Sequence, residues 1–80
     1  MKYYTDINLK DFNNSHTIAY YYVESIAQGR KLEILEVGCS AGYFGSLLCK
    51  SGHIVWGVEP DKESSSEAEK SLNYVFNGSL

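Results

Sequence analysis

The chain has 80 residues, of which 44% are hydrophobic and 21% charged, and its formal net charge at pH 7 is -3. This length allows at most one domain with one modest core, and the composition is that of a globular protein rather than a disordered one. The acidic balance argues against a nucleic acid or an anionic membrane held by bulk electrostatics, and no apolar run approaches the ~20 residues of a membrane helix.

Residues 1–14 form a polar and aromatic N-terminal segment without a clear period. This segment lacks the apolar stretch of a secretory signal, so we expect a cytoplasmic location. A leading helix is predicted over residues 15–29, with Ser15 as its N-cap and Gly29 ending it in the left-handed conformation. Four apolar residues share one face of this helix, which we expect to turn toward the core: Ile18, Tyr22, Val23 and Ile26.

The rest of the chain, residues 32–80, alternates short apolar runs with helical segments. We predict strands at residues 32–37, 54–58 and 73–76, and helices at residues 43–51 and 61–72. The first run suits a strand covered on both faces, as parallel strands are. Strand, helix and strand at this spacing require parallel pairing with right-handed crossovers. The predicted fold class is therefore α/β: a Rossmann-like parallel sheet, with a leading helix and then β-α-β-α-β, corresponding to one half of a doubly wound sheet.

Two strand ends carry residues that suit a ligand, because open parallel sheets bind ligands beyond the carboxyl ends of their strands. Gly38 lets the chain turn sharply off the first strand, and Gly42 removes a side chain where a ligand or a helix approaches. Glu59 follows the second apolar run, and its carboxylate can accept both hydroxyls of a ribose. These features predict an adenosine-type ligand.

Other nucleotide motifs fit poorly. A dinucleotide fingerprint needs glycine at its first, third and sixth positions, but counting from Gly38 the latter two hold Ser40 and Tyr43. The Gly-Lys-Ser/Thr of a P-loop is also missing. The chain instead has the pattern Glu36-x-Gly38-x-x-x-Gly42, followed by Glu59 at the end of the second strand.

This set of residues resembles the class I S-adenosylmethionine-dependent methyltransferases. The match runs through residues 34–45 and 55–61 and covers about residues 32–80, with residues 15–29 in the place of the family's leading helix. The resemblance implies that residues 1–80 are a single partial domain, the N-terminal, cofactor-binding half of a methyltransferase, incomplete relative to the full fold. Its cofactor would be S-adenosylmethionine, and the methyl acceptor is not identified.

The resemblance also implies how the residues surround the cofactor. The methionyl part would be lined by Glu36 and by the backbone of Gly38, Cys39, Ser40, Ala41 and Gly42. Glu59 would hold the ribose hydroxyls. The adenine would be bordered by Pro60, Asp61 and Ser79. Ser79 stands where the family often has an aspartate that contacts the adenine amine, and Ser40 stands where it often has a glycine.

Plainer structural interpretations remain open for some of these residues. Glu36 could instead be a strand-end carboxylate that accepts a backbone N–H, and Cys39 could be a small buried side chain. Cys39 and Cys49 are both predicted to be reduced thiols. His53 is predicted to be a surface or turn residue rather than a catalytic base, and no residue is an obvious base for the methyl acceptor.

Two functional hypotheses follow. The first is the cofactor-binding portion of a methyltransferase, inactive alone, because six strands at this spacing would need roughly 130 residues. The alternative is a non-catalytic module that binds adenosine nucleotides or mediates an interaction. In the strand order 3-2-1 the first strand is central in a complete fold but an exposed apolar edge here, so we expect self-association through that edge.

Overall fold

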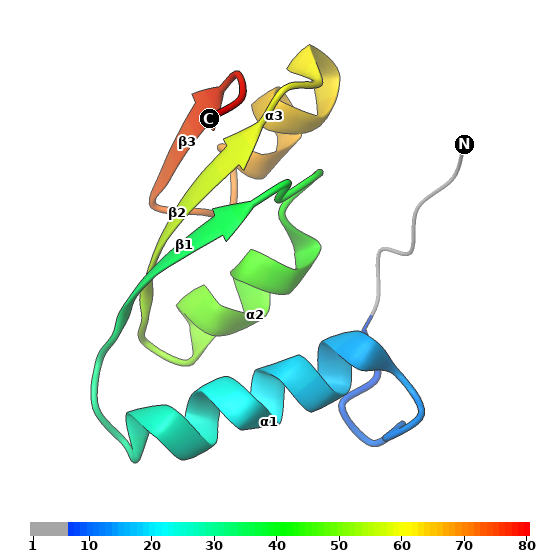
Figure 1. Ribbon diagram of the computed structural model, residues 1–80, viewed down its shortest axis with the longest axis vertical. Helices are drawn as coiled ribbons and strands as arrows, with labels where there is room; N and C mark the ends of the chain where they lie inside the picture. Colours follow the sequence, from blue (N-terminus) through cyan, green and yellow to red (C-terminus); the bar gives the residue numbers. More distant parts are fainter. Residues whose placement is uncertain (1–6) are drawn as a thin grey trace.

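The computed structural model describes residues 7–80, so residues 1–6 of the N-terminal segment lie outside the described residues. The elements in chain order are α1 (Ser15–Ala27), β1 (Glu33–Val37), α2 (Tyr43–Lys50), β2 (Ile54–Glu59), α3 (Lys62–Ala68) and β3 (Tyr74–Asn77), shown in Figure 1. All strand pairs are parallel, and the strand order is β1-β2-β3. The predicted α/β, Rossmann-like fold class is confirmed. Among residues 7–80 no helix is long and apolar enough to cross a membrane.

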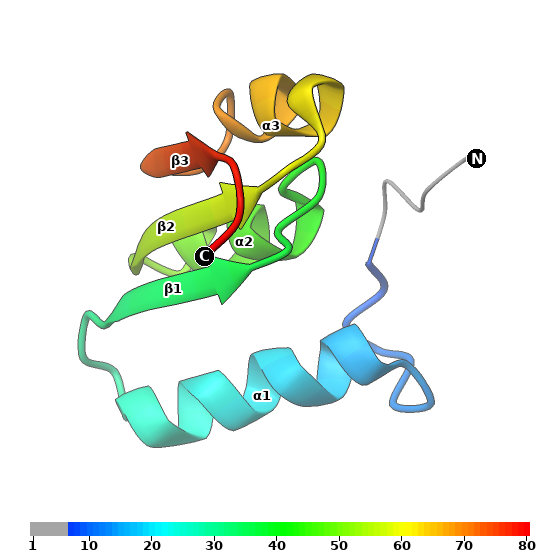
Figure 2. The same cartoon turned by 45° about the horizontal axis from the view of Figure 1, so that its top comes forward.

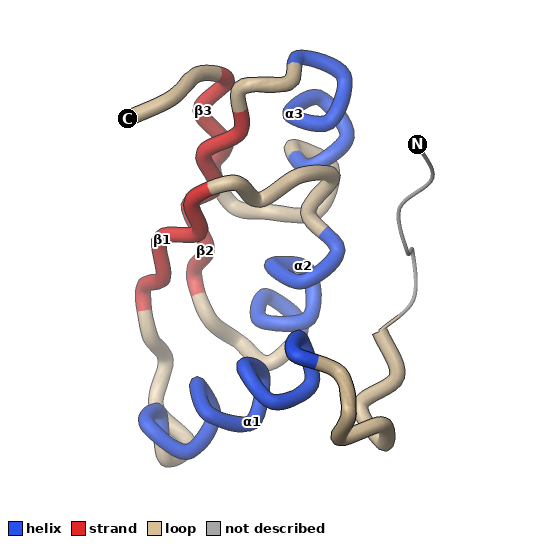
Figure 3. The backbone as a smooth tube through the Cα atoms, turned by 45° about the vertical axis from the view of Figure 1, so that its right-hand side comes forward, coloured by secondary structure: helices blue, strands red, loops and turns tan. Residues whose placement is uncertain are grey.

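Helices α2 and α3 cover one face of the sheet, and α1 lies beside α2 (Figures 1 and 3). The core between the layers is formed by Cys39, Leu48, Val55, Ala68 and Leu72. Gly57 in the central strand β2 lies directly over this core. A Cβ atom at Gly57 would lie 2.7 Å from the sulfur of Cys39 and 2.8 Å from a methyl group of Leu72. The side chains of Cys39 and Leu72 can therefore pack this closely on the sheet only because position 57 has no side chain.

The opposite face of the sheet differs from the sequence-based expectation. Strand β1 was predicted to be covered on both faces, but Leu35 and Val37 are exposed. That prediction is wrong because α2 and α3 both lie on the other side of the sheet, and α1 lies beside α2 (Figure 3).

The ends of α1 follow the predicted signals with a shift of one residue at the start. The side chain of Asn14 accepts a hydrogen bond from the His16 N–H at 2.8 Å, so Asn14 is the N-cap and Ser15 is the first helical residue. The prediction of Ser15 as the cap is wrong. At the other end Gln28 and Gly29 both have positive φ angles, of 50° and 80°. The left-handed conformation of Gly29 is as expected.

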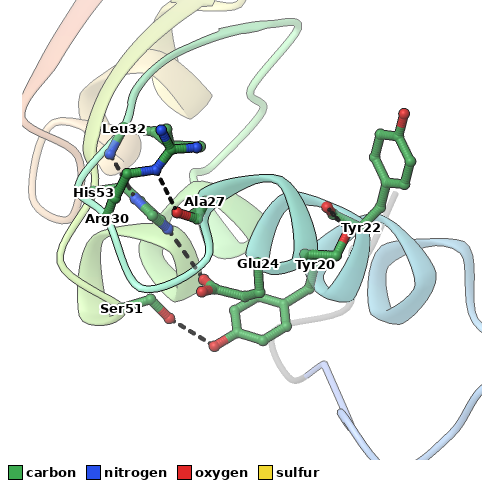
Figure 4. A network of polar contacts seen from close by, with 9 residues as sticks. Tyr20, Tyr22, Glu24, Ala27, Arg30, Leu32, Ser51 and His53 are labelled. Carbon is green, nitrogen blue, oxygen red and sulfur yellow. Dashed lines mark hydrogen bonds and ion pairs between the residues drawn. The ribbon is translucent and has the colours of Figure 1, made fainter.

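The face of α1 that turns toward α2 also differs from the prediction. Of the four apolar residues expected to face inward, only Val23 packs against the core. The prediction is wrong for the other three, which are exposed: Ile18, Tyr22 and Ile26. Figure 4 shows that Tyr20 and Tyr22 point to opposite sides of the helix, with Tyr20 on the side of α2. The inward face contains polar groups, so apolar periodicity alone selected the wrong side.

Those polar groups attach α1 to the connection between α2 and β2 (Figure 4). The Tyr20 hydroxyl lies 2.6 Å from the hydroxyl of Ser51. The ring of His53 accepts a hydrogen bond from the Leu32 N–H through Nδ1 at 3.0 Å, so Nε2 carries the ring hydrogen and donates it to Glu24 at 3.1 Å. His53 lies in the predicted turn, but it is buried and not a surface residue. Its imidazole joins α1 to the residues that precede β1 and β2.

Helix α3 is shorter than predicted. It ends at Ala68 instead of Leu72, and a turn carries Leu72 into the core, where both residues are buried. The start of the helix matches the prediction, because the carboxylate of Asp61 accepts a hydrogen bond from the Ser64 N–H at 2.9 Å. Asp61 is therefore the N-cap of α3.

Candidate functional site

The turn that follows β1 is anchored to β2 by its backbone. Gly38 has a φ of 73°, which lets the chain leave the strand abruptly, as predicted. The N–H groups of Gly38 and Cys39 both donate to the carbonyl of Val58, at 2.7 Å and 3.1 Å. The candidate turn is therefore held against the carboxyl end of the neighbouring strand.

Ser40 lies at the tip of this turn in a left-handed conformation, with a φ of 53°. This conformation costs a residue with a side chain about 1–2 kcal/mol relative to its ordinary one. Glycine would adopt this conformation without that cost. The Ser40 N–H donates to Oε1 of Glu59 at 2.7 Å, a charge-assisted bond that helps to hold the turn.

Gly42 is the N-cap residue that precedes α2, and its φ is 89°. A Cβ atom at this position would lie 3.1 Å from the Cα of Ala68 in α3. The sequence predicted that either a ligand or a helix approaches Gly42. The structure shows the close approach of a helix, α3. Ala41, between Ser40 and Gly42, is half-buried.

The carboxylate of Glu59 connects the two candidate loops. Oε1 accepts from the Ser40 N–H, and Oε2 accepts from the Asp61 N–H at 2.9 Å. Glu59 therefore points toward the turn after β1, as the ligand hypothesis requires. A carboxylate has about four acceptor positions. These two bonds leave each oxygen able to accept one more hydrogen bond.

The residues expected near an adenine are exposed at the same end of the sheet. Pro60 and Asp61 follow β2, and Ser79 follows β3. The carboxylate of Asp61 is used in capping α3, and its hydrogen bond to the Ser64 N–H lowers the pKa of Asp61.

Asn77 was not identified from the sequence, although it holds this edge together. Its side-chain amide donates to the carbonyls of Glu59 at 3.0 Å and Pro60 at 3.1 Å. Asn77 could have been identified because it is an amide residue at the end of the third apolar run. In the parallel register it is paired with Glu59.

Glu36 extends from β1 into the space beneath α2. Its Oε1 would lie 2.7 Å from a Cβ atom placed on Gly45, and within residues 7–80 this buried oxygen has no hydrogen-bond partner. The expected alternative, in which Glu36 accepts a backbone N–H, is therefore not observed for this oxygen. Burial raises the pKa of Glu36 from an ordinary value of 4.5 to about 7. Burial thus disfavours the charged form of this carboxyl group, and a cation beside it would favour that form again.

Cys39 lies close to both carboxylates of the site. Its thiol is buried against Gly57, which supports the interpretation of a small core side chain, and both cysteines of the chain are free thiols. Burial raises the pKa of Cys39, and the charges of Glu36 and Glu59 raise it further. Both carboxylates are thus close enough to the turn to act on the same thiol.

The electrostatics of the turn favour a cationic ligand over a phosphate. Phosphate sites use free backbone N–H groups, but those of Gly38, Cys39 and Ser40 already donate to Val58 and Glu59. Within the described residues no basic side chain forms an ion pair with Glu36 or Glu59. Glu36 and Glu59 therefore offer carboxylate oxygens to a ligand, whereas the first three N–H groups of the turn are already engaged.

No protein-family model matches the sequence, and no curated protein matches it. Among solved structures, the PH0226 protein from Pyrococcus horikoshii OT3 has a TM-score of 0.56 at 17% identity, over 78% of this chain and 33% of its own. A TehB-like SAM-dependent methyltransferase from Corynebacterium glutamicum ATCC 13032 has a TM-score of 0.54 at 22% identity, over 85% of this chain and 46% of its own.

The chain thus spans about a third of the length of the first structure and less than half of the second. At these identities the likeness shows the fold alone. The arrangement of helices and parallel strands in this chain is one that occurs in a SAM-dependent methyltransferase.

Proposed function

We propose that this chain is the S-adenosylmethionine-binding portion of a methyltransferase. The observation that carries the proposal is a pair of carboxylates, Glu36 and Glu59, that flank the turn after β1 and have no basic partner within the described residues. The shared fold with the TehB-like methyltransferase supports it. The methyl acceptor remains unassigned, and a cytoplasmic location is part of the proposal.

The chemistry of the two carboxylates fits the cofactor. S-adenosylmethionine carries an ammonium and a sulfonium charge, whereas a dinucleotide carries an anionic pyrophosphate. The carboxylate of Glu36 would accept the ammonium, and the remaining acceptor positions of Glu59 would hold the ribose hydroxyls. The adenine would lie along Pro60, Asp61 and Ser79.

Within a methyltransferase, this chain would bind and orient the methyl donor. The bound cofactor supplies an activated methyl group on its sulfonium. Holding that group in a fixed place accelerates an in-line transfer through positioning. None of the described residues beside the turn is a base for the acceptor, so the proposed chain binds the donor without catalysing transfer by itself.

The test measures binding by calorimetry at pH 8 with three ligands: S-adenosylmethionine, adenosine and NAD. Glu36→Gln should weaken S-adenosylmethionine binding about tenfold or more, the value of one charge-assisted bond. The same variant should leave adenosine binding unchanged, because adenosine lacks the ammonium. Glu33→Gln is the matched control, since Glu33 is on the same strand but bonds to Trp56 on the opposite face.

The outcomes separate the hypotheses. Tighter binding of NAD than of S-adenosylmethionine would refute the methyl-donor proposal. Equal affinity for adenosine and S-adenosylmethionine, unaffected by Glu36→Gln, would favour the non-catalytic adenosine-binding module, which needs Glu59 but not Glu36.

A further inference from the structure

One oxygen of the Glu36 carboxyl group is enclosed by apolar groups. Glu36 extends from β1 toward α2, which lies behind the strands in Figure 2. A Cβ atom placed on Gly45 would lie 2.7 Å from Oε1 of Glu36 and 2.5 Å from Cδ2 of Leu72, so the oxygen and the leucine methyl group share the space over this glycine. Within residues 7–80 Oε1 has no hydrogen-bond partner. The groups that enclose it lie within residues 36–72, so the enclosure does not depend on chain that precedes or follows them.

The titratable groups around Glu36 add no positive charge to this enclosure. Burial raises the pKa of Cys39, in the turn after β1, and of Cys49, in α2, and the charge of Glu36 raises each further. The charge of Glu59 acts on the same Cys39 thiol, and the turn after α3 contributes the apolar Leu72. No ion pair within the described residues includes Glu36. The cost of burying its charge is therefore not offset, and the pKa of Glu36 is about 7.

We propose that binding of the methyl donor expels a proton from Glu36, so that pH controls the affinity of the site. This inference rests on the proposed function, because it requires the ammonium group of the ligand to pair with Glu36. The proton passes to the solvent, and a carboxylate paired with an ammonium group is left in the complex. The ammonium would meet the carboxylate from its outer side, since Oε1 is enclosed.

The direction of the effect follows from the linkage between binding and protonation. Below about pH 7 the free site holds the proton, and each ligand that binds must displace it. The affinity should therefore rise with pH, roughly eightfold between pH 5.5 and pH 6.5, and level off above pH 7. It should fall again once the ligand loses its own charge, because an α-amino group has a pKa of about 7.7–8.0.

Three ligands separate the contributions of their charged groups. S-adenosylmethionine carries an ammonium and a sulfonium charge. S-adenosylhomocysteine, its demethylated product, keeps the ammonium and lacks the sulfonium charge. Adenosine lacks both, although it shares the ribose and the adenine. If the ammonium pairs with Glu36, the first two ligands should expel the proton and adenosine should not.

The test counts protons by calorimetry of the unmodified protein at pH 6, in two buffers that differ in their enthalpy of ionisation. Binding of S-adenosylmethionine or S-adenosylhomocysteine should release about 0.9 proton, the fraction held by a group with a pKa of about 7. Adenosine should release none. Glu36→Gln should abolish the release. The matched control is Glu33→Gln, which should release the same amount as the unmodified protein, since Glu33 bonds to Trp56 on the opposite face of the sheet.

A second measurement keeps the test decisive if Glu36→Gln does not fold or binds too weakly. Carbon-13 NMR of the Glu36 carboxyl group gives its ionisation midpoint with and without S-adenosylmethionine. A cation within about 4–6 Å should lower this midpoint by about 1–3 pH units. Binding of S-adenosylmethionine without proton release and with an unchanged midpoint would overturn this inference and leave the proposed function standing. Equal release by adenosine would also overturn it. Failure of S-adenosylmethionine to bind at pH 8, where Glu36 is ionised, would overturn the proposed function itself.

Discussion

The unusual protonation of Glu36 should make folding stability depend on pH, and Glu36→Gln should remove that dependence. An acid with a higher pKa in the folded state than in the unfolded state binds more protons when folded. The free energy of unfolding therefore falls as the pH rises from about 4.5 to about 7, and it stays low above that range.

The structure sets the magnitude. A pKa of about 7 against an ordinary 4.5 corresponds to a loss of at most about 3 kcal/mol at high pH. The side chain is only partly buried, so solvent screening reduces the expected effect to roughly 1–2 kcal/mol. Glutamine at position 36 has a similar shape and never ionises, so it should not show this loss.

The assay is urea unfolding followed by far-ultraviolet circular dichroism at pH 5 and pH 8. Other groups also titrate, so the informative quantity is the difference between Glu36→Gln and the unmodified chain. The two proteins should be similarly stable at pH 5, and Glu36→Gln should be more stable by roughly 1–2 kcal/mol at pH 8. A difference that is the same at both pH values would refute the conclusion that burial of Glu36 disfavours its charged form.

Two further predictions concern stability. Ser40→Gly should raise the free energy of unfolding by about 0.5–1 kcal/mol in urea denaturation, because relief of the left-handed conformation exceeds the added entropy of the unfolded chain; a loss of stability would contradict this account. His53→Leu should lower the unfolding free energy by about 1–3 kcal/mol in the same assay, since the Leu32 N–H and Glu24 lose their partner. Unchanged stability would mean that this contact does not hold α1 in place.

Much of the fold could be predicted from local signals. The spacing of the apolar runs led to three parallel strands, because a connection containing one helix returns the chain in the same direction. Gly38 and Asp61 marked a turn and a helix start that require those residue types. These features depend on neighbours in sequence, so a sequence-based argument reaches them.

The candidate site was only partly accessible in this way. The sequence indicated that Gly38 and Glu59 would lie at adjacent strand ends, and the structure brings them together. The sequence did not indicate that Glu59 bonds to the backbone of the loops after β1 and β2. It also did not indicate that Asn77 supports the end of β2. The bonds that Glu59 forms with Ser40 and Asn77 join residues 19 and 18 apart in the sequence, and a parallel register is needed before they can be seen.

The amino-acid sequence by itself determined where helices, strands and turns form, since these follow from backbone preferences and apolar spacing. Only the tertiary structure decided which face of α1 is buried and how Glu36 is protonated. Tyr20 and Glu24 turn inward because Ser51 and His53 offer them partners, although apolar residues on the other side predicted the reverse. Burial depends on the groups that meet across the fold, and a pattern of single residues does not contain that information.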